Sequence, residues 1–306
     1  MLLTVEHLSV TFHREGREIV PVRDVSFSVP EHGRVALVGE SGCGKSLTAL
    51  SLARLPPIDR ASMGGRIDFK GRISYVFQNP SESLNPVMRI AEQIREALPK
   101  GMDRRAQEAR IVELLARTGL PDPTRAAKAY PCELSGGQQQ RCMIAMALAA
   151  EPDLLVADEP TTALDVTTQK QVLELIDSLA AETGMAVLLI THNLGLVAGR
   201  MDLVNVMYAG RIVESGPVVE VLAHPRHPYT KGLLAAVPAL DAPRDAPLAD
   251  IHGTVPPPDA WPTGCAFWPR CVQVSERCRQ AQPPEQIVRG CRASCWLLAS
   301  KQCAAQ

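Results

Sequence analysis

The chain has 306 residues, of which 46% are hydrophobic, and it carries 32 Lys plus Arg against 33 Asp plus Glu. This length is enough for a well-buried core and is long for a single minimal domain. The formal net charge of -1 argues against a nucleic-acid binder that works through a broad basic surface. We therefore expect no nucleic-acid partner.

Membrane insertion and secretion are both disfavoured by the sequence. A bilayer-spanning helix needs roughly 18–20 apolar residues, whereas the longest apolar stretches are Met143–Ala150 and Ala186–Ile190. The start of the sequence, MLLTVEHLSV, has neither the basic region nor the small-residue cleavage site of a secretory signal. We expect a chain that stays in the cytoplasm and reaches a membrane only through a partner.

The first part of the chain alternates strand patterns with a helix pattern. Leu2–Val10 and Ile19–Val29 show the alternation of β-rich strands. Arg34–Val38 predicts a short buried strand, which runs through a Gly-rich turn into a helix near Lys45–Leu55. Ile73–Phe77 predicts a further strand.

The pattern changes to the helical period from about Ile90 to Leu120. Beyond it, Asp153–Ala157 and Ala186–Ile190 are continuous apolar runs, as expected for central strands of a parallel sheet. Strands interleaved with helices predict an α/β fold. Ala242–Pro258 is rich in Pro, Ala and Asp and predicts a linker or an extended wrap.

A glycine-rich loop joins the third predicted strand to the helix after it. Its residues are Gly39, Glu40, Ser41, Gly42, Cys43, Gly44, Lys45 and Ser46, which fit the phosphate-loop pattern G-x-x-x-x-G-K-[ST] and are followed by Leu47. Such a loop points backbone N–H groups, that of Cys43 included, at the phosphates of ATP. We expect Lys45 to reach the outer phosphates and the Ser46 hydroxyl to coordinate Mg²⁺.

Two acids follow the apolar stretch Leu154–Ala157. Ligands of α/β sheets bind at the carboxyl ends of the strands, so we expect Asp158 to hold Mg²⁺ and Glu159 to polarise the attacking water. Taken alone, the two acids could simply begin a solvent-exposed loop. Together with the loop at Lys45 they predict an ATPase site.

The stretch Leu134-Ser135-Gly136-Gly137-Gln138 resembles the signature motif of ABC (ATP-binding cassette) ATPases. The other landmarks of that family occur in order across about residues 1–235: Phe12, Gln78 in Phe77-Gln78-Asn79-Pro80, Ala163-Leu164-Asp165, and His192. The resemblance implies a P-loop NTPase with a RecA-like core, an antiparallel β subdomain and an α-helical signature subdomain at about residues 88–150.

The resemblance also implies a role for each landmark. Phe12 would stack on adenine, Gln78 would join Ser46 and Asp158 around Mg²⁺, and His192 would hydrogen-bond the γ-phosphate. Ser135, Gly136 and Gly137 would contact the nucleotide held by an opposite subunit. The expected catalytic residues are therefore Glu159, His192, Gln78 and Lys45.

Four further stretches narrow the resemblance: Ser83–Pro86, Ala157–Thr167, His227–Lys231 and Leu233–Pro238. They are similar to the peptide/opine/nickel importer ATPases, and the pair Thr161-Thr162 resembles the first ATPase of such importers. The resemblance implies ATP-driven import at the cytoplasmic face of the membrane. The implied partners are a second homologous ATPase, two membrane permease subunits and an extracytoplasmic substrate-binding protein. Which solute is carried stays open.

The C-terminal region, residues 236–306, carries six of the nine cysteines. Cys265, Cys271, Cys278 and Cys295 fit the C-terminal pattern of many relatives in the resembled family. Four thiolates suit Zn²⁺ or an iron–sulfur cluster, and the absence of C-x₂-C knuckles favours a [4Fe–4S] cluster over zinc. Unliganded thiols stay an alternative, and Cys291 or Cys303 could replace one of the four.

Two other classes of function compete with an importer ATPase. ABC ATPases of repair or chromosome organisation insert a long coiled coil before the signature, whereas here about ninety residues without heptads separate Lys45 from Ser135. Translation factors of the family usually carry two cassettes, and this chain has one. A redox or interaction module built on the cysteines would not need the intact ATPase positions.

Overall fold

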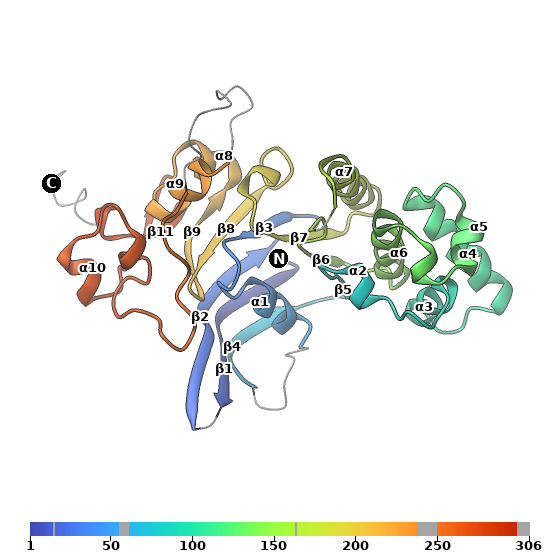
Figure 1. Cartoon of the computed structure of the whole chain (residues 1–306), viewed down its shortest axis with the longest axis horizontal. Coiled ribbons are helices and arrows are strands. Elements are labelled where there is room, and N and C mark those ends of the chain that lie inside the picture. The colour runs from blue at the N-terminus through green and yellow to red at the C-terminus, as the bar shows by residue number, and fades with distance from the viewer. Residues whose placement is uncertain (15, 55–60, 163, 238–249, 299–306) are drawn as a thin grey trace.

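The computed structural model describes residues 1–14, 16–54, 61–162, 164–237 and 250–298. Within these residues the chain builds two β-sheets, a helical region at one end and a cysteine-bearing C-terminal unit at the other (Figure 1). The expected positions Ala163, Pro238 and Cys303 lie outside the described residues, as does the 242–249 part of the expected linker. Residues 250–258 of that linker contain neither a helix nor a strand.

The smaller sheet is antiparallel, with the strand order β2-β1-β4. It consists of β1 (Leu3–Arg14), β2 (Arg17–Val29) and β4 (Ala61–Phe69). Val25, Phe27 and Val29 of β2 are all buried, because side chains on alternate positions of a strand point to the same face. The first two strands confirm the predicted alternation and extend beyond it, whereas the sequence analysis did not predict β4.

The larger sheet has eight strands in the order β10-β11-β9-β8-β3-β7-β6-β5. Their bounds are β3 (Arg34–Val38), β5 (Ile73–Val76), β6 (Leu154–Asp158), β7 (Ala186–Thr191), β8 (Leu203–Tyr208), β9 (Arg211–Pro217), β10 (Glu285–Val288) and β11 (Cys291–Ser294). The strands from β8 to β5 run parallel to one another. All six residues of β7 are buried, as expected for a central parallel strand covered on both faces.

Helices cover this sheet and form the region between β5 and β6. Beside the sheet lie α1 (Lys45–Leu52), α7 (Val166–Thr183), α8 (Val218–Ala223) and α9 (Pro228–Ala235). The helical region contains α2 (Pro80–Ser83), α3 (Ile90–Ala97), α4 (Arg104–Arg117), α5 (Pro123–Lys128) and α6 (Gly136–Ala149). Figure 1 shows this region standing apart from the small sheet. In the described part of the chain, no helix is both long and apolar enough to cross a membrane.

The C-terminal unit, which we define as residues 250–298, is joined to the core sheet. It contains α10 (Glu276–Gln280) and the hairpin of β10 and β11. Strand β11 pairs antiparallel with β9 through Arg292 opposite Ser215 and Ala293 opposite Glu214. The region that the sequence analysis set apart from residue 236 therefore contributes two strands to the main sheet.

Candidate functional site

The phosphate loop turns sharply between β3 and α1, and two of its glycines are required by close contacts. Gly44 has φ +102°, and a Cβ there would lie 2.7 Å from the Pro21 carbonyl oxygen. A Cβ on Gly39 would lie only 2.2 Å from the Met207 carbonyl oxygen. Helix α1 begins at Lys45 without a side-chain cap on its first N–H groups. These donors therefore stay available for an anion, as at other phosphate-binding helix starts.

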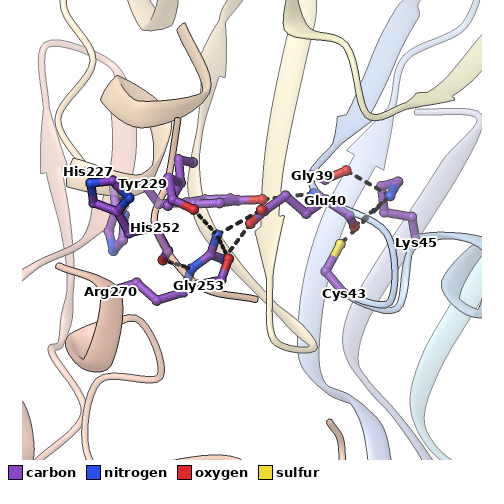
Figure 2. A network of polar contacts seen from close by, with 10 residues as sticks. Gly39, Glu40, Cys43, Lys45, His227, Tyr229, His252, Gly253 and Arg270 are labelled. Atoms are coloured by element: carbon purple, nitrogen blue, oxygen red, sulfur yellow. Dashed lines mark hydrogen bonds and ion pairs between the residues drawn. The ribbon is translucent and has the colours of Figure 1, made fainter. Parts of the chain in front are cut away.

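The Lys45 side chain is buried beside this loop, with 4% of it exposed. Its Nζ donates hydrogen bonds to the carbonyl oxygens of Gly39, at 2.8 Å, and Glu40, at 2.9 Å. Figure 2 shows the lysine directed back at the loop. Because a buried ammonium group is costly unless it is paired, the site favours an incoming anion.

Glu159 is the point on which the predicted catalytic side chains converge. Its Oε1 lies 4.0 Å from Lys45 Nζ, and its Oε2 lies 3.1 Å from His192 Nδ1. The same Oε2 accepts a hydrogen bond from Gln78 Nε2 at 3.3 Å. It accepts another from the Thr162 hydroxyl at 2.9 Å. The structure thus brings together all four predicted catalytic residues and adds Thr162, which the sequence analysis quoted only as part of a family motif.

Asp158 has an unsatisfied oxygen at the end of β6. Its Oδ1 is buried and has no hydrogen-bond partner in the described structure. Burial raises the pKa of Asp158, while a hydrogen bond with the Ser46 side chain lowers it. Buried polar atoms are rarely left unpaired, and carboxylate and hydroxyl oxygens are the ligands that Mg²⁺ prefers. Asp158 and Ser46 therefore fit a magnesium ion.

A cavity of about 780 Å³ opens over these groups. Its lining residues are Glu40, Ser41, Gly42, Gly44, Lys45, Ser46, Leu47, Gln78, Glu159, His192, Gly253, Thr254 and Val255. The first ten come from the predicted phosphate loop and its catalytic neighbours. The last three come from the C-terminal unit, and the sequence analysis did not assign them to the site.

The predicted adenine contact and the predicted signature turn lie outside the cavity lining, as do Gly39, Cys43 and Asp158. Phe12, expected to stack on adenine, pairs with Ile19 and Ala61 in the small sheet and packs against its core. Ser135 precedes α6 in the helical region, with Gly136 as the first residue of the helix. Both assignments stay predictions.

The four cysteines of the expected iron–sulfur cluster all lie in the C-terminal unit. The backbone N–H of Cys265 donates to the Cys278 carbonyl oxygen at 2.8 Å. Burial first, and then the nearby Cys278, Cys295 and Cys271, together raise the pKa of the Cys265 thiol to about 11. Among the described residues, however, no group of three or more His, Cys, Asp or Glu side chains is arranged to hold a metal ion. The expected cluster therefore has no support from the structure.

Cys291, considered above as a substitute ligand, has different surroundings. It is fully buried on β11, and its Sγ would lie 2.5 Å from a Cβ on Gly216. Burial raises the pKa of its thiol, while the charge of Arg226 lowers it and the charge of Glu214 raises it. Its surroundings place it against β9.

The sheet, the phosphate loop, and the acids Asp158 and Glu159 define an ATP-binding cassette. Residues 22–162 match the ABC transporter family, and residues 213–278 match the C-terminal region of oligopeptide/dipeptide transporters. A peptide import ATP-binding protein of Brucella abortus is 44% identical, over 96% of this chain and 94% of the relative. One from Brucella ovis is 49% identical, over 92% and 93%. The chain belongs to the family of ABC transporter ATP-binding proteins, in the group with the oligopeptide/dipeptide C-terminal region.

Solved cassettes share the fold. An ATP-binding cassette solved as a dimer in a post-hydrolysis state with ADP and Pi is 26% identical, with a TM-score of 0.60, over 71% of this chain and 98% of the cassette. The cbiO1 protein of Clostridium perfringens, part of the cbiONQ ABC transporter complex, is 25% identical, with a TM-score of 0.62, over 73% and 91%.

Proposed function

We propose that the chain is the ATP-hydrolysing subunit of an ABC importer for peptides or related small solutes. The observation that carries the proposal is the convergence of Lys45, Gln78, His192 and Thr162 on Glu159, at the floor of the cavity formed by the phosphate loop. The names of the Brucella relatives as peptide import proteins support the transport role.

The side chains of the site divide the work of hydrolysis. The phosphate loop and Lys45 bind the triphosphate, because the ammonium group and the uncapped start of α1 both attract anions. Glu159 orients and polarises the attacking water through an oxygen already placed beside Lys45. Ser46 and Asp158, with Gln78, would hold Mg²⁺, which neutralises charge on the phosphates when bound.

His192, Phe12 and the signature turn complete the proposed site. His192, more exposed than Glu159, would contact the γ-phosphate from the open side of the cavity. Phe12 would stack on adenine. Ser135, Gly136 and Gly137 would close over the nucleotide of a second, homologous ATPase subunit. The similar cassette that was solved as a dimer supports the pairing of two ATPase subunits. The other proposed partners are two permease subunits and an extracytoplasmic substrate-binding protein, with the chain at the cytoplasmic face.

A role in repair or translation is not favoured. The stretch between β5 and β6 folds into short helices, of which the longest have 14 residues, within the described part of the chain. These helices pack on one another around Ile94, Leu114 and Met143, so no coiled coil protrudes from this stretch.

The direct test replaces Glu159 by Gln, which keeps the shape and removes the charge. We expect ATP hydrolysis by the assembled transporter to fall by about 100-fold or more, because a positioned general base contributes on the order of 10²–10⁴-fold. ATP binding should persist. Glu182→Gln, an exposed position at the end of α7, serves as the matched control. Unchanged hydrolysis in Glu159→Gln would contradict the mechanism.

The [4Fe–4S] cluster belongs to the same proposal as a separate hypothesis. It rests on the spacing of Cys265, Cys271, Cys278 and Cys295 in the sequence, and all four lie in the C-terminal unit. Its role would be structural. Iron and sulfide analysis of anaerobically purified protein, together with zinc analysis, tests it. Protein free of both metals would leave four structural thiols.

A further inference from the structure

Arg270 reaches from the C-terminal unit to the phosphate loop. Its Nη1 lies 2.6 Å from Glu40 Oε2, and its Nη2 donates to Glu40 Oε1 at 2.9 Å. Figure 2 shows the two side chains facing one another between the C-terminal unit and the loop that carries Lys45. Only 4% of the Arg270 side chain is exposed. Two parallel, shielded contacts of this kind fix orientation as well as charge.

The same guanidinium holds a segment of its own unit. Arg270 Nε donates to the His252 carbonyl oxygen at 2.9 Å. Its Nη2 also donates to the carbonyl oxygens of Ile251, at 2.8 Å, and Gly253, at 3.1 Å. One side chain thus ties residues 251–253 to the phosphate loop. A lysine could not reproduce this set, because its donors do not form a planar fork.

The segment held by Arg270 leads directly into the nucleotide cavity. Gly253, Thr254 and Val255 line it together with the phosphate loop. The segment is also packed at both of its ends. Ile251 lies against Gly232 of α9, where an added Cβ would come within 2.8 Å of Ile251 Cγ1.

At the other end, Trp261 packs over Gly210, where a Cβ would lie 2.3 Å from the indole ring. The backbone N–H of Gly210 donates to the Cys43 carbonyl oxygen at 2.9 Å, so this contact too reaches the phosphate loop. The guanidinium of Arg23 stacks over the Trp261 ring at 3.8 Å. Arg270 therefore contacts the loop directly, and Trp261 is connected to it through Gly210.

The Arg270–Glu40 pair affects ATP binding through the negative charge of Glu40. Glu40 lies inside the phosphate loop and lines the cavity. An unpaired carboxylate there would repel a triphosphate, because like charges a few ångströms apart interact strongly in a partly buried site. Arg270 neutralises it, and the Tyr229 hydroxyl, which accepts a hydrogen bond from the Glu40 N–H at 2.8 Å, fixes the backbone.

We propose that Arg270 is a positioning residue of the nucleotide site, through which the C-terminal unit forms one wall of the ATP pocket. Arg270 neutralises Glu40 in the phosphate loop and holds residues 253–255 against the cavity. The proposal rests on the proposed ATPase function of this pocket. It makes the C-terminal unit a part of the nucleotide site.

The test measures equilibrium binding of Mg-ATP to the full-length chain with Glu159→Gln in place to prevent turnover. Arg270→Met should weaken binding by about tenfold, since it exposes the nucleotide to an unpaired carboxylate. The affinity of Arg270→Lys should lie between those of the parent chain and Arg270→Met, because lysine keeps the positive charge and loses the planar fork of donors. Arg277→Met is the matched control: Arg277 stacks on Trp296 in the same unit and should leave affinity unchanged.

A double variant separates charge from general damage to the fold. Adding Glu40→Gln to Arg270→Met removes the repelling carboxylate, so it should restore ATP affinity by about threefold or more. In the assembled transporter with Glu159 intact, Arg270→Met should raise KM and leave kcat within about twofold, as expected for lost binding energy. Unchanged affinity in Arg270→Met, or no recovery in the double variant, overturns the proposal. Failure of the parent protein to bind ATP would instead overturn the proposed function.

Discussion

Helices α1 and α6 both have glycine at the N-terminus, Gly44 as the N-cap of α1 and Gly136 as the first residue of α6, and these N-termini differ. Helix α1 starts at Lys45 without a side-chain cap, inside a cavity and beside a buried ammonium group. Helix α6 starts after Ser135, whose hydroxyl accepts from the Gln138 N–H at 3.4 Å, while Gln138 Oε1 accepts from the Ser135 N–H at 3.0 Å. Ser135 and Gly136 are exposed to solvent.

The difference separates what one chain can do from what needs a second subunit. The start of α1 has free donors, a cation and walls, so it can bind an anion without help. The start of α6 is capped by the side chains of Ser135 and Gln138 and is exposed to solvent at Ser135 and Gly136. It can join a nucleotide site only when another surface supplies the rest of it. The predictions below test this contrast, beginning with the largest expected effect.

Lys45→Met should remove nucleotide binding at the start of α1, which needs no second subunit. We expect the affinity of the isolated chain for Mg-ATP to fall by about 100-fold, because charge-assisted hydrogen bonds to phosphate are lost. Isothermal titration measures it. Lys170→Met, an exposed change on α7, is the control. If Lys45→Met kept the affinity of the parent chain for Mg-ATP, the start of α1 would not depend on Lys45 for anion binding, and the contrast with α6 would fail.

Ser135→Arg should affect only the helix start that depends on a partner. Bulk and charge at this turn should lower hydrolysis by the assembled transporter by about 30-fold, since the closed arrangement can no longer form around the phosphates. The isolated chain should bind Mg-ATP as before. A loss of affinity in the isolated chain would show that Ser135 acts within its own subunit.

Thr162→Val tests how Glu159 is held in the cavity. The Thr162 hydroxyl donates to Glu159 Oε2 at 2.9 Å, so its loss should let the carboxylate turn away from the water. We expect kcat to fall by about fivefold with KM unchanged, the pattern of an interaction that acts on the chemical step. Thr167→Val, at an exposed position, should change neither value.

The N-terminus of α9 gives a prediction about folding stability instead of nucleotide binding. His227 caps α9, where its Nδ1 accepts from the Tyr229 N–H at 3.1 Å, and burial lowers its pKa from 6.5 to about 3. As pH falls below 6.5, the unfolded chain binds a proton that the folded chain cannot accept until about pH 3. Folding stability should therefore fall by up to about 1.4 kcal/mol per pH unit in this window.

His227→Asn keeps a capping acceptor and removes the titrating ring. Chemical denaturation between pH 6.5 and 4 measures how the free energy of unfolding changes with pH. This slope should be shallower in His227→Asn than in the parent chain, by the contribution of about one proton. Equal slopes in the two proteins would mean that His227 is protonated in the folded state.

The sequence predicted the central strands well because burial on both faces leaves a continuous apolar run, as in β6 and β7. It did not predict β4, where Ser62, Gly64 and Gly65 interrupt the apolar pattern. Pairing with β1, rather than local propensity, makes that segment a strand.

The site was predicted to the same uneven extent. Residues with a fixed backbone motif, such as Lys45, could be found because the chemistry demands a spacing along the chain. Arg270 could not, because 230 positions separate it from Glu40 and no spacing rule connects them. The fork at Arg270 can be recognised only once the fold brings the two segments together.

The pairing of β11 with β9 bears on how this protein can be shortened. A strand with neighbours on both sides offers no free N–H and C=O groups to other molecules. If the chain were cut before residue 250, β9 would lose its pairing partner at Glu214 and Ser215. It would become an exposed edge strand, along which two such molecules could pair. A shortened protein for crystallisation or binding assays should therefore retain the hairpin of β10 and β11.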